Sequence, residues 1–251
     1  HYKIVQECIP WLRRVEEIVT IYDKGMNAEV LYSLLMADLQ DIGTFKETDT
    51  RKIYVPENPD LVYLVVIDHI SLLRPNKGRS LKEEIDLVSS YLVTLRNMCR
   101  ISPLVIMQAN RDSAGMERRK QGLNNMRLSD TKDSGGPVQD AEVVISIFSP
   151  HRERLATYNK YNIGILQDKF RAITVLKNRY GEADVEIGVN FFGRCGIWKE
   201  LPKPDEIYDY ERYTNPNYML EDSDIAIDNS HSLDNDTELD QPKNDFNFIL
   251  S

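Results

Sequence analysis

The segment Leu61–Asp68 (Leu-Val-Tyr-Leu-Val-Val-Ile-Asp) constrains the fold more than any other part of the sequence. It is almost wholly apolar and ends on a carboxylate. A strand with apolar residues at consecutive positions is buried on both faces, which is typical of a parallel sheet covered by helices. The sequence therefore predicts an α/β fold with its polar chemistry at the end of this strand.

The segments that follow continue in strand–helix–strand order, as a βαβ unit requires. Leu81–Cys99 has the apolar spacing of an amphipathic helix, and Pro103–Gln108 is a second apolar run of strand length. The further expected strands are a third buried one, a hairpin around Tyr180-Gly181 and one short strand, at Val143–Phe148, Phe170–Lys177 with Asp184–Phe192, and Gly193–Leu201.

The region before Leu61 predicts two helices, a short strand and a loop. The first helix covers Ile4–Ile18 and is followed by a β-branched strand at Val19–Tyr22. Asn27 is a suitable N-cap for a second helix that reaches Leu39. The polar segment Thr44–Asp60 predicts a loop. The expected core face of the second helix is formed by Val30, Leu31, Leu34 and Leu35.

The charge is unevenly distributed along the chain, which carries a net charge of −9. Residues 203–251 hold 13 acidic and 3 basic residues, which leaves 27 acidic and 28 basic residues in 1–202. We therefore expect a nearly neutral folded body over 1–202 and an acidic, mostly disordered tail over 203–251. The tail ends on the apolar segment Phe246–Leu250.

Cysteine usage and hydropathy place the chain in a broad class. The three cysteines, Cys8, Cys99 and Cys195, are far apart and form no metal-binding pair, so we expect buried, reduced thiols. No apolar run approaches the roughly 18–20 residues of a membrane span. We expect a cytoplasmic protein without a membrane partner.

Two side chains that end expected strands are candidates for nucleotide chemistry. Parallel strands deliver the residues at their carboxyl ends to the crevice where ligands bind in α/β sheets. Asp68 can hold Mg²⁺ there, beside nucleotide phosphates. Gln108 can contact a γ-phosphate or orient a water. Taken alone, each is equally compatible with a polar residue that merely ends a strand.

A third group of candidates is cationic. The segment Asp112–Gly136 lacks apolar periodicity and is rich in Arg and Lys, which suits contact with a phosphate backbone but also suits a charged surface loop. Near the hairpin tip, Lys177 and Arg179 have the geometry of an arginine finger that reaches a neighbour's nucleotide. The candidates for DNA contact are Arg111, Arg127, Lys132, Asp133 and Gly135.

The order of these motifs is specific for a known family, although no single motif is. Four motifs follow one another over 19–202. They are a strand that ends in Asp, a strand with Gln-x-Asn-Arg at its end, the segment Ser-Asp-x-x-x-Ser-Gly-x-x-x-Gln-Asp-Ala-Glu before a strand, and Lys-x-Arg-x-Gly. This order resembles the RecA-like motor domain of DnaB-type replicative helicases. The resemblance implies a mostly parallel sheet flanked by helices, with a C-terminal antiparallel hairpin.

The resemblance also implies roles for individual residues. Asp68 would serve the Mg²⁺ of bound ATP, and Gln108 would sense the γ-phosphate. Arg179 and Lys177 would act on the ATP of the neighbouring subunit in a hexameric ring. The segment with Lys132, Asp133 and Gly135 would contact single-stranded DNA in the central channel. A primase or a helicase loader is the expected protein partner.

The chain departs from the family pattern at several points. His69, the pair Lys132-Asp133 and Pro137 replace the commoner residues. None of the 12 glycines belongs to a Gly-x-x-x-x-Gly-Lys-Ser/Thr loop, so the amide cradle and lysine for ATP phosphates are missing. Because the chain begins at His1, we expect a truncated helicase whose loop lies upstream, and we expect this chain alone not to hydrolyse ATP.

Two alternatives stay open at this point. A RecA-like recombinase or clock-type ATPase has the same fold, and unwinding of a forked substrate would distinguish a helicase from it. A non-catalytic, helicase-like protein that regulates or loads another ring is the alternative from another class. The acidic tail would either dock a replication partner or serve as a solubilising end.

Overall fold

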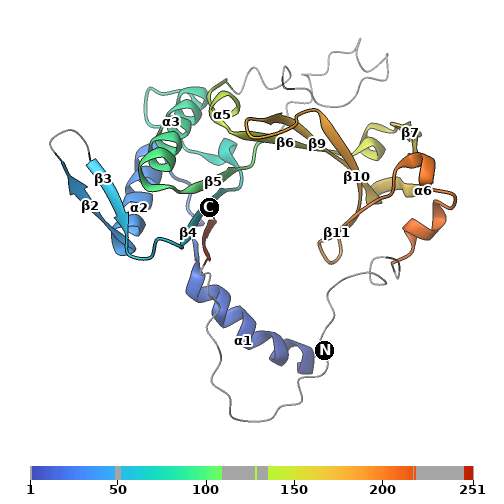
Figure 1. The fold of residues 1–251 in the computed structure, drawn as a ribbon, viewed down its shortest axis with the longest axis horizontal. Coiled ribbons are helices and arrows are strands. Elements are labelled where there is room, and N and C mark those ends of the chain that lie inside the picture. Colours follow the sequence, from blue (N-terminus) through green and yellow to red (C-terminus); the bar gives the residue numbers. More distant parts are fainter. Residues whose placement is uncertain are drawn as a thin grey trace. The chain divides into compact units, whose positions relative to one another are not determined.

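The computed structural model describes residues 2–48, 52–108, 128, 135–216, 218 and 246–250. It divides the chain into two compact units (Figure 1). The first unit takes the described residues within 1–109, 133–140 and 239–251. The second takes those within 110–132 and 141–238. Each unit has a sheet and a core of its own, and each is described by itself.

The first unit contains a four-stranded parallel sheet in the order β1-β12-β4-β5. A separate antiparallel hairpin, β2–β3, accompanies it. The strands are β1 (Val19–Ile21), β2 (Gly43–Glu47), β3 (Lys52–Pro56), β4 (Val62–Ile67), β5 (Ser102–Val105) and β12 (Phe246–Leu250). The helices are α1 (Tyr2–Ile18), α2 (Ala28–Asp41), the 3₁₀ turn η1 (Ile70–Leu72), α3 (Leu81–Cys99) and α5 (Gly135–Asp140).

Strand β4 is the buried centre of this unit, as its sequence predicts. Val65, Val66 and Ile67 are all buried, and Val65 packs in one core with residues of α2 and α3. The hydroxyl of Tyr63 also donates a 2.9 Å hydrogen bond to Asp38 of α2. The predicted strand Leu61–Asp68 and the predicted helix Leu81–Cys99 are thereby confirmed.

The two helices begin at residues that satisfy their free backbone amides. The Asn27 side chain accepts a 2.9 Å hydrogen bond from the amide of Val30, which confirms the predicted N-cap of α2. At the start of α3, Ser80 and Glu83 form a capping box. Such caps typically contribute about 1 kcal/mol each, so they fix where the helices begin.

A buried carboxylate joins α2 to α3. Glu84 of α3 is 0% exposed and accepts a hydrogen bond from the amide of Ala28, the first residue of α2. The guanidinium of Arg79 pairs with Glu84 at 2.9 Å and with Glu29 at 2.8 Å. Glu84 thus satisfies a free amide of one helix from inside the other, and Arg79 neutralises its charge.

The second unit contains an antiparallel sheet in the order β11-β10-β9-β6. Short helical turns and a two-stranded ribbon, β7–β8, complete it. The strands are β6 (Val143–Phe148), β7 (Thr157–Tyr158), β8 (Tyr161–Asn162), β9 (Phe170–Asn178), β10 (Val185–Phe192) and β11 (Ile197–Glu200). The helical turns are η3 (Pro150–Glu153), α6 (Ile163–Leu166), η4 (Gln167–Lys169), η5 (Pro204–Glu206) and η6 (Glu211–Thr214).

One face of this second sheet packs on a core around Phe170. Ile163 and Leu166 of α6 are fully buried in this core, and Tyr161 lies against the ring of Phe170. A side chain at Gly188 of β10 would approach the Tyr161 ring to 2.7 Å, so the close packing requires glycine there. The predicted hairpin is confirmed as β9–β10, and the expected strand in Gly193–Leu201 as β11.

Two expected buried strands are exposed in the structure. β5 ends at Val105, so Gln108 lies beyond the strand, and Leu104 is 52% exposed. β6 buries alternate positions, and Ile145 and Ile147 are 57% and 60% exposed. On β6 the exposed residues share one face of the sheet, and Val185 and Ile187 of the inner strand β10 are exposed on that face too, so among the described residues this face is left partly uncovered. β6 also pairs antiparallel with β9 rather than joining the parallel sheet.

Three further expectations differ from the structure. The polar segment Thr44–Asp60 contains the hairpin β2–β3, with a tilted contact between Phe45 and Tyr54. Val30 of α2 is exposed, and Ala28 and Leu39 occupy the core beside Leu31 and Leu35. Among the cysteines, Cys99 is buried while Cys8 and Cys195 are exposed.

The acidic end of the chain also differs from its expected description. Packed structure continues past Pro202, because Ile207 is buried in the second core and Tyr213 packs against it. At the other end of the segment, Phe246–Leu250 forms β12, which lies between β1 and β4 and runs parallel to both. The expected disorder of 219–245 falls outside the described residues.

Among the helices that the structure describes, none is both long and apolar enough to cross a membrane.

Candidate nucleotide-binding edge

The carboxyl end of β4 places Asp68 at the edge of the parallel sheet. Asp68 follows the last strand residue, Ile67, and its side chain is exposed. The peptide bond between Asp68 and His69 is cis. The ring atom Nδ1 of His69 is buried, and within the described part of the chain no hydrogen-bond partner reaches it. An exposed carboxylate therefore lies next to a buried polar atom that is left without a partner.

Backbone hydrogen bonds join the residues that follow β5 to the end of β4 and the residues after it. The amide of Ile106 donates to the carbonyl oxygen of Ile67 at 2.9 Å, and the amide of Ile70 donates to the carbonyl oxygen of Ile106 at 3.1 Å. These two bonds hold the residues after both strands side by side. Gln108 is exposed two residues after Ile106, so Asp68 and Gln108 follow two strand ends that lie at the same edge of the sheet.

In the β9–β10 hairpin, Arg179 of the cationic pair is bonded to Glu142, the residue directly before β6. Arg179 donates a hydrogen bond at 3.1 Å to the carboxylate of Glu142, and its backbone amide donates to the Glu142 carbonyl oxygen at 3.0 Å. Lys177 lies in β9 and is half-buried. The turn is stiffened by Asn178, whose side chain accepts from the amide of Tyr180 at 3.0 Å. Lys177 and Arg179 thus lie beside the turn of a hydrogen-bonded hairpin.

The predicted DNA-contacting residues lie almost wholly outside the described residues. Arg111, Arg127, Lys132 and Asp133 fall in this group. Gly135 is the first residue of α5, and the next amide, that of Gly136, donates to the carboxylate of Asp86 at 3.0 Å. The amide of Gly136, next to the candidate Gly135, is thus bonded to an acidic side chain.

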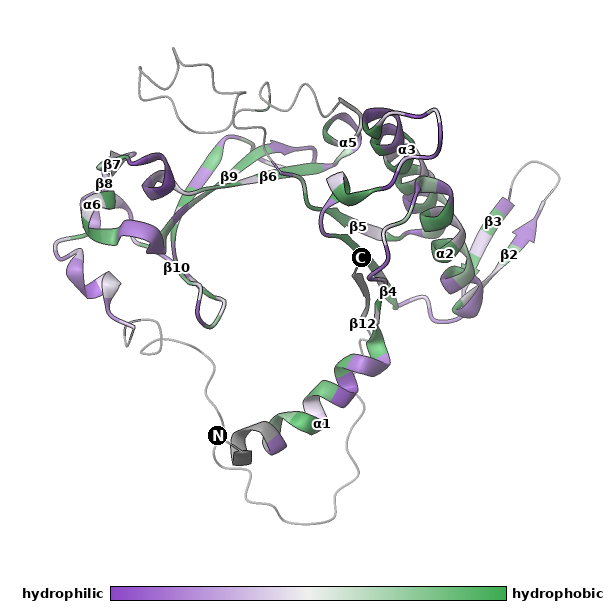
Figure 2. Ribbon diagram, turned by 180° about the vertical axis from the view of Figure 1, so that it is seen from behind, coloured by the Kyte–Doolittle hydropathy of each residue, from purple (hydrophilic) through white to green (hydrophobic). Residues whose placement is uncertain are grey.

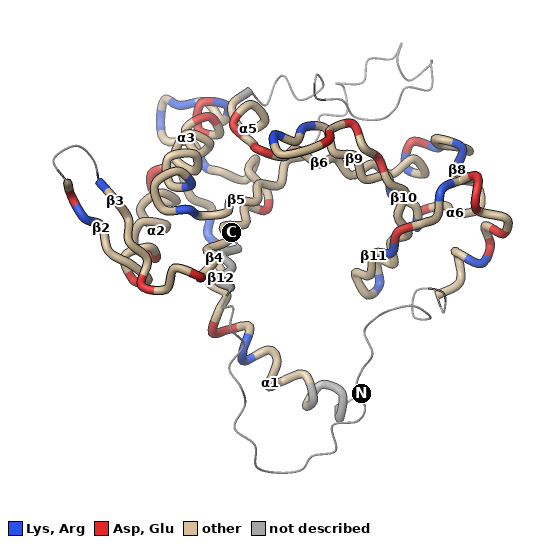
Figure 3. The backbone as a smooth tube through the Cα atoms, viewed as in Figure 1, with Lys and Arg blue, Asp and Glu red and all other residues tan. Residues whose placement is uncertain are grey.

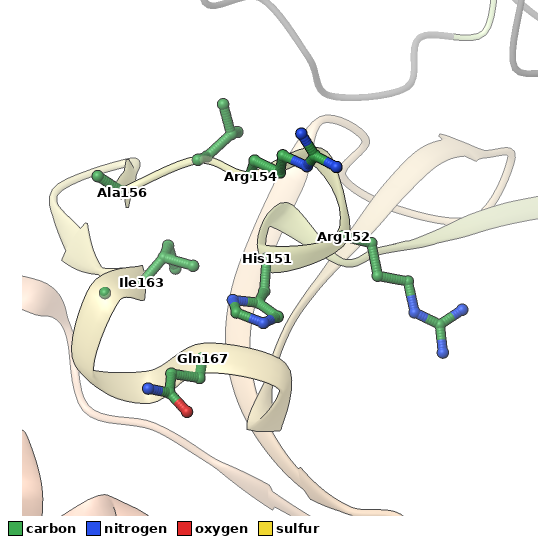
Figure 4. Close-up of a pocket in the computed structure, with 8 residues that line it drawn as sticks. His151, Arg152, Arg154, Ala156, Ile163 and Gln167 are labelled. Atoms are coloured by element: carbon green, nitrogen blue, oxygen red, sulfur yellow. The ribbon is translucent and has the colours of Figure 1, made fainter.

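An open cavity of about 480 Å³ in the second unit escaped the sequence reasoning (Figure 4). The ring of His151 points toward the turn that carries Gln167, whereas the side chain of Arg152 points away from it. Arg152 instead lies 3.9 Å from Asp168. The sequence feature that could have indicated this cavity is the group of basic residues His151, Arg152 and Arg154, which follows the strand β6. The lining residues are His151, Arg152, Arg154, Leu155, Ala156, Ile163, Gly164 and Gln167.

Where the structure describes the two units, acidic and basic residues lie close to one another along the chain. Figure 3 shows acidic and basic positions interleaved along α3 and again around α6 and β8. Where an Arg or Lys is described, a carboxylate is often its neighbour, as in the pair of Lys160 with Asp205 at 3.1 Å. Among the described residues, no group of three or more His, Cys, Asp or Glu side chains is arranged to hold a metal ion.

Comparison with known proteins supports the resemblance. The family model of the DnaB-like helicase C-terminal domain matches residues 26–199. A solved structure of an ATPase domain has a TM-score of 0.54 at 18% identity, over 73% of this chain and 55% of that one. A structure of a DnaB-like replicative helicase, studied for its interactions with primase, has a TM-score of 0.53 at 18% identity, over 73% of this chain and 38% of that one.

These structures share the fold with this chain, which spans only about half, or less, of their length. No curated protein sequence matches this chain. The family match covers well over half of the 251 residues and includes Asp68, Gln108, Lys177 and Arg179. The chain therefore belongs to the family of DnaB-like helicase C-terminal domains.

Proposed function

We propose that this chain is part of the motor of an ATP-dependent replicative DNA helicase, in which it contributes the Mg²⁺ and γ-phosphate side of the nucleotide site. The observation that carries the proposal is the shared edge of Asp68 and Gln108, which the bonds between Ile67, Ile106 and Ile70 hold together. Family membership supports it.

The donor chemistry at this edge fits one part of a Mg²⁺·ATP complex. Mg²⁺ in nucleotide sites takes one or two carboxylates, and phosphate oxygens and waters complete its shell. Asp68 is such a carboxylate, exposed at a strand end, and Gln108 offers an amide to a phosphate oxygen. The phosphate-binding loop is missing from the sequence, so this chain alone holds ATP weakly and does not hydrolyse it.

In the proposed motor the other named residues have separate tasks. Lys177 and Arg179, on the rigid hairpin, neutralise phosphate charge on the ATP of a neighbouring subunit in a ring. Arg111, Arg127, Lys132, Asp133 and Gly135 follow the backbone of single-stranded DNA, and unwinding during replication is the result. A primase or a loader is the proposed protein partner, since one structural neighbour is described with primase.

Paramagnetic mapping tests the nucleotide part directly. Mn²⁺ replaces Mg²⁺ beside ATP and broadens the amide resonances of nearby residues in the ¹⁵N-labelled chain. We expect residues 67–70 and 106–108 to broaden most, and the Asp68→Asn variant to lose this effect. Asp60→Asn, an acidic position before β4, is the matched control. Uniform broadening in the native chain would contradict the proposal.

The DNA part has its own measurement. Binding of a fluorescent single-stranded oligonucleotide should weaken as salt rises, because each Lys or Arg on a phosphate releases counterions. Lys132→Ala should reduce the steepness of this dependence by roughly one phosphate contact. Binding that does not change with salt, or that favours duplex DNA, would remove the role in single-strand translocation.

A further inference from the structure

The strand β12 holds an inner place in the sheet of the first unit, although it follows the other described elements of that unit by more than 100 positions. It runs parallel to β1 on one side and to β4 on the other, and it is the dark red arrow beside β4 in Figure 1. Among the strands that the structure describes, β12 is the only one that pairs with β1. β12 therefore joins β1 to β4 by pairing alone, without a local connection to either strand.

The two strands beside β12 are held by contacts in which β12 takes no part. The hydroxyl of Tyr22, the residue directly after β1, donates a hydrogen bond to the carboxylate of Asp38 in α2 at 3.1 Å. The hydroxyl of Tyr63 in β4 donates to the same carboxylate at 2.9 Å. One carboxylate thus ties both strands to α2, and we call this arrangement the Asp38 brace. Because the brace is independent of β12, it keeps β1 and β4 in place when β12 is absent.

The place between β1 and β4 has the size and the chemistry of one extended strand, and we call it the strand slot. Two neighbours of a shared strand lie two strand spacings apart, which is roughly 10 Å. Backbone N–H and C=O groups of both strands pair with β12 across the slot. They need such partners because Val65 and Val66 of β4 are only 1% and 8% exposed. Figure 2 shows that β4 is mostly apolar along its length, so an extended, apolar peptide suits the slot.

We propose that the strand slot is a peptide-binding site, and that Phe246–Leu250 is its exchangeable ligand within this chain rather than a permanent strand of the sheet. The ligand is an extended peptide that enters parallel to β1 and β4 and is apolar at four of its five positions. Peptides that bind by strand addition obtain affinity from main-chain hydrogen bonds and specificity from alternate side chains. The site needs neither nucleotide nor DNA, so it stands or fails separately from the proposed helicase function.

The register identifies a position on which binding depends. Ile249 is aligned with Val65 of β4 and with Thr20 of β1. Val65 packs in the core with residues of α2 and α3. A lysine at position 249 brings a charge to this row, and a buried charge without a partner is strongly unfavourable. Ile249→Lys should therefore expel Phe246–Leu250 from the slot, while the sequences of β1, β4 and the Asp38 brace stay native.

Exchange with a free peptide tests the slot. A fluorescent peptide with the sequence of residues 244–251 is titrated into three full-length chains, the native chain, Ile249→Lys and Asn244→Lys, and its anisotropy is followed. Asn244→Lys adds the same charge outside β12 and is the matched control. The peptide should bind Ile249→Lys at least roughly tenfold more tightly than the other two chains, because the competing segment of the same chain no longer fills the slot. A peptide with lysine at the position of Ile249 should not bind.

Three outcomes would overturn the proposal. One is a peptide that binds all three chains equally, because it would then bind elsewhere. Another is a folded Ile249→Lys chain that does not bind the peptide. The last is an Ile249→Lys chain that unfolds, which circular dichroism detects, because β12 would then be a permanent part of the fold.

Hydrogen exchange of backbone amides is the second measurement, and it includes the native chain. Amides of residues 19–21 and 62–66 that bond to β12 should exchange slowly in the native chain and quickly in Ile249→Lys. Saturation of Ile249→Lys with the native peptide should make them slow again, while the amides of α3 should not change. Fast exchange at 19–21 in the native chain, or slow exchange there in Ile249→Lys without peptide, would refute the exchangeable strand.

Discussion

Ile106 donates its backbone N–H to the carbonyl oxygen of Ile67 at 2.9 Å, across the ends of two parallel strands. The bond continues the ladder between β4 and β5 beyond the last paired residues, Ile67 and Val105. It thereby fixes where Asp68 and Gln108 leave the sheet. Two side chains separated by 40 positions in the sequence reach one edge because of backbone pairing alone.

The buried Glu84 should be essential for the stability of the first unit. Glu84→Ala removes the acceptor of the Ala28 amide and leaves Arg79 with only Glu29, so we expect a loss of about 3 kcal/mol in the free energy of unfolding. Glu84→Gln keeps the shape and one acceptor and should lose less. Urea denaturation measures both. An alanine variant as stable as the native chain would show that the network contributes little.

Cys99 should differ from the other two cysteines in reactivity. Burial raises the pKa of its thiol from the ordinary value of 9.0 to about 11, whereas Cys8 and Cys195 are exposed. The thiolate is the reactive form, so a thiol reagent at pH 8 should modify two cysteines quickly and Cys99 only after unfolding. Rapid labelling of all three in the folded chain would contradict this burial.

The same shift predicts how stability depends on pH. Between about pH 9 and 11 the unfolded chain loses the proton of Cys99 while the folded chain keeps it. The unfolded state then binds fewer protons, so this contribution to stability decreases as the pH rises through that window. Cys99→Ala should remove this contribution, which denaturation of both chains at pH 8 and pH 10.5 would reveal.

Arg179 should contribute little to folding although it is bonded to Glu142. Its side chain is 49% exposed, and ion pairs with that exposure stabilise proteins by about 1 kcal/mol or less. Arg179→Ala should therefore unfold within about 1 kcal/mol of the native chain. A small effect leaves the guanidinium available for the proposed role at a neighbour's nucleotide. A loss well above 2 kcal/mol would instead make Arg179 a structural residue of the hairpin.

Local patterns in the sequence predicted the elements whose partners lie nearby. The apolar run of β4, the periodicity of α3 and the Asn27 cap each act within one element, and all three were predicted. The hairpin β9–β10 was predicted because its strands adjoin a Tyr-Gly turn. The hairpin β2–β3 was missed because the segment Thr44–Asp60 is mostly polar and contains two prolines, and the apolar run of β3, Ile53–Val55, is only three residues long.

The sequence did not reveal where each strand lies within its sheet or which of its faces is covered. Val143–Phe148 has the composition of a strand buried on both faces, yet Ile145 and Ile147 are exposed, because they lie on a face of the sheet that also leaves Val185 and Ile187 of β10 exposed. β12 pairs with β1 and β4, whose residues lie more than 180 positions earlier, and no local pattern encodes such a pairing. The burial of Glu84 likewise depends on an amide contributed by another helix.

The dependence of nucleotide affinity on Mg²⁺ tests the central claim most directly. A fluorescent ATP analogue is titrated into the native chain, Asp68→Asn and Asp60→Asn, each with Mg²⁺ and with a chelator. If Asp68 serves the metal of the nucleotide, Mg²⁺ strengthens binding to the native chain and to Asp60→Asn, and this gain disappears in Asp68→Asn. Equal Mg²⁺ dependence in all three chains, or none in the native chain, would contradict the assignment of this edge as the nucleotide site.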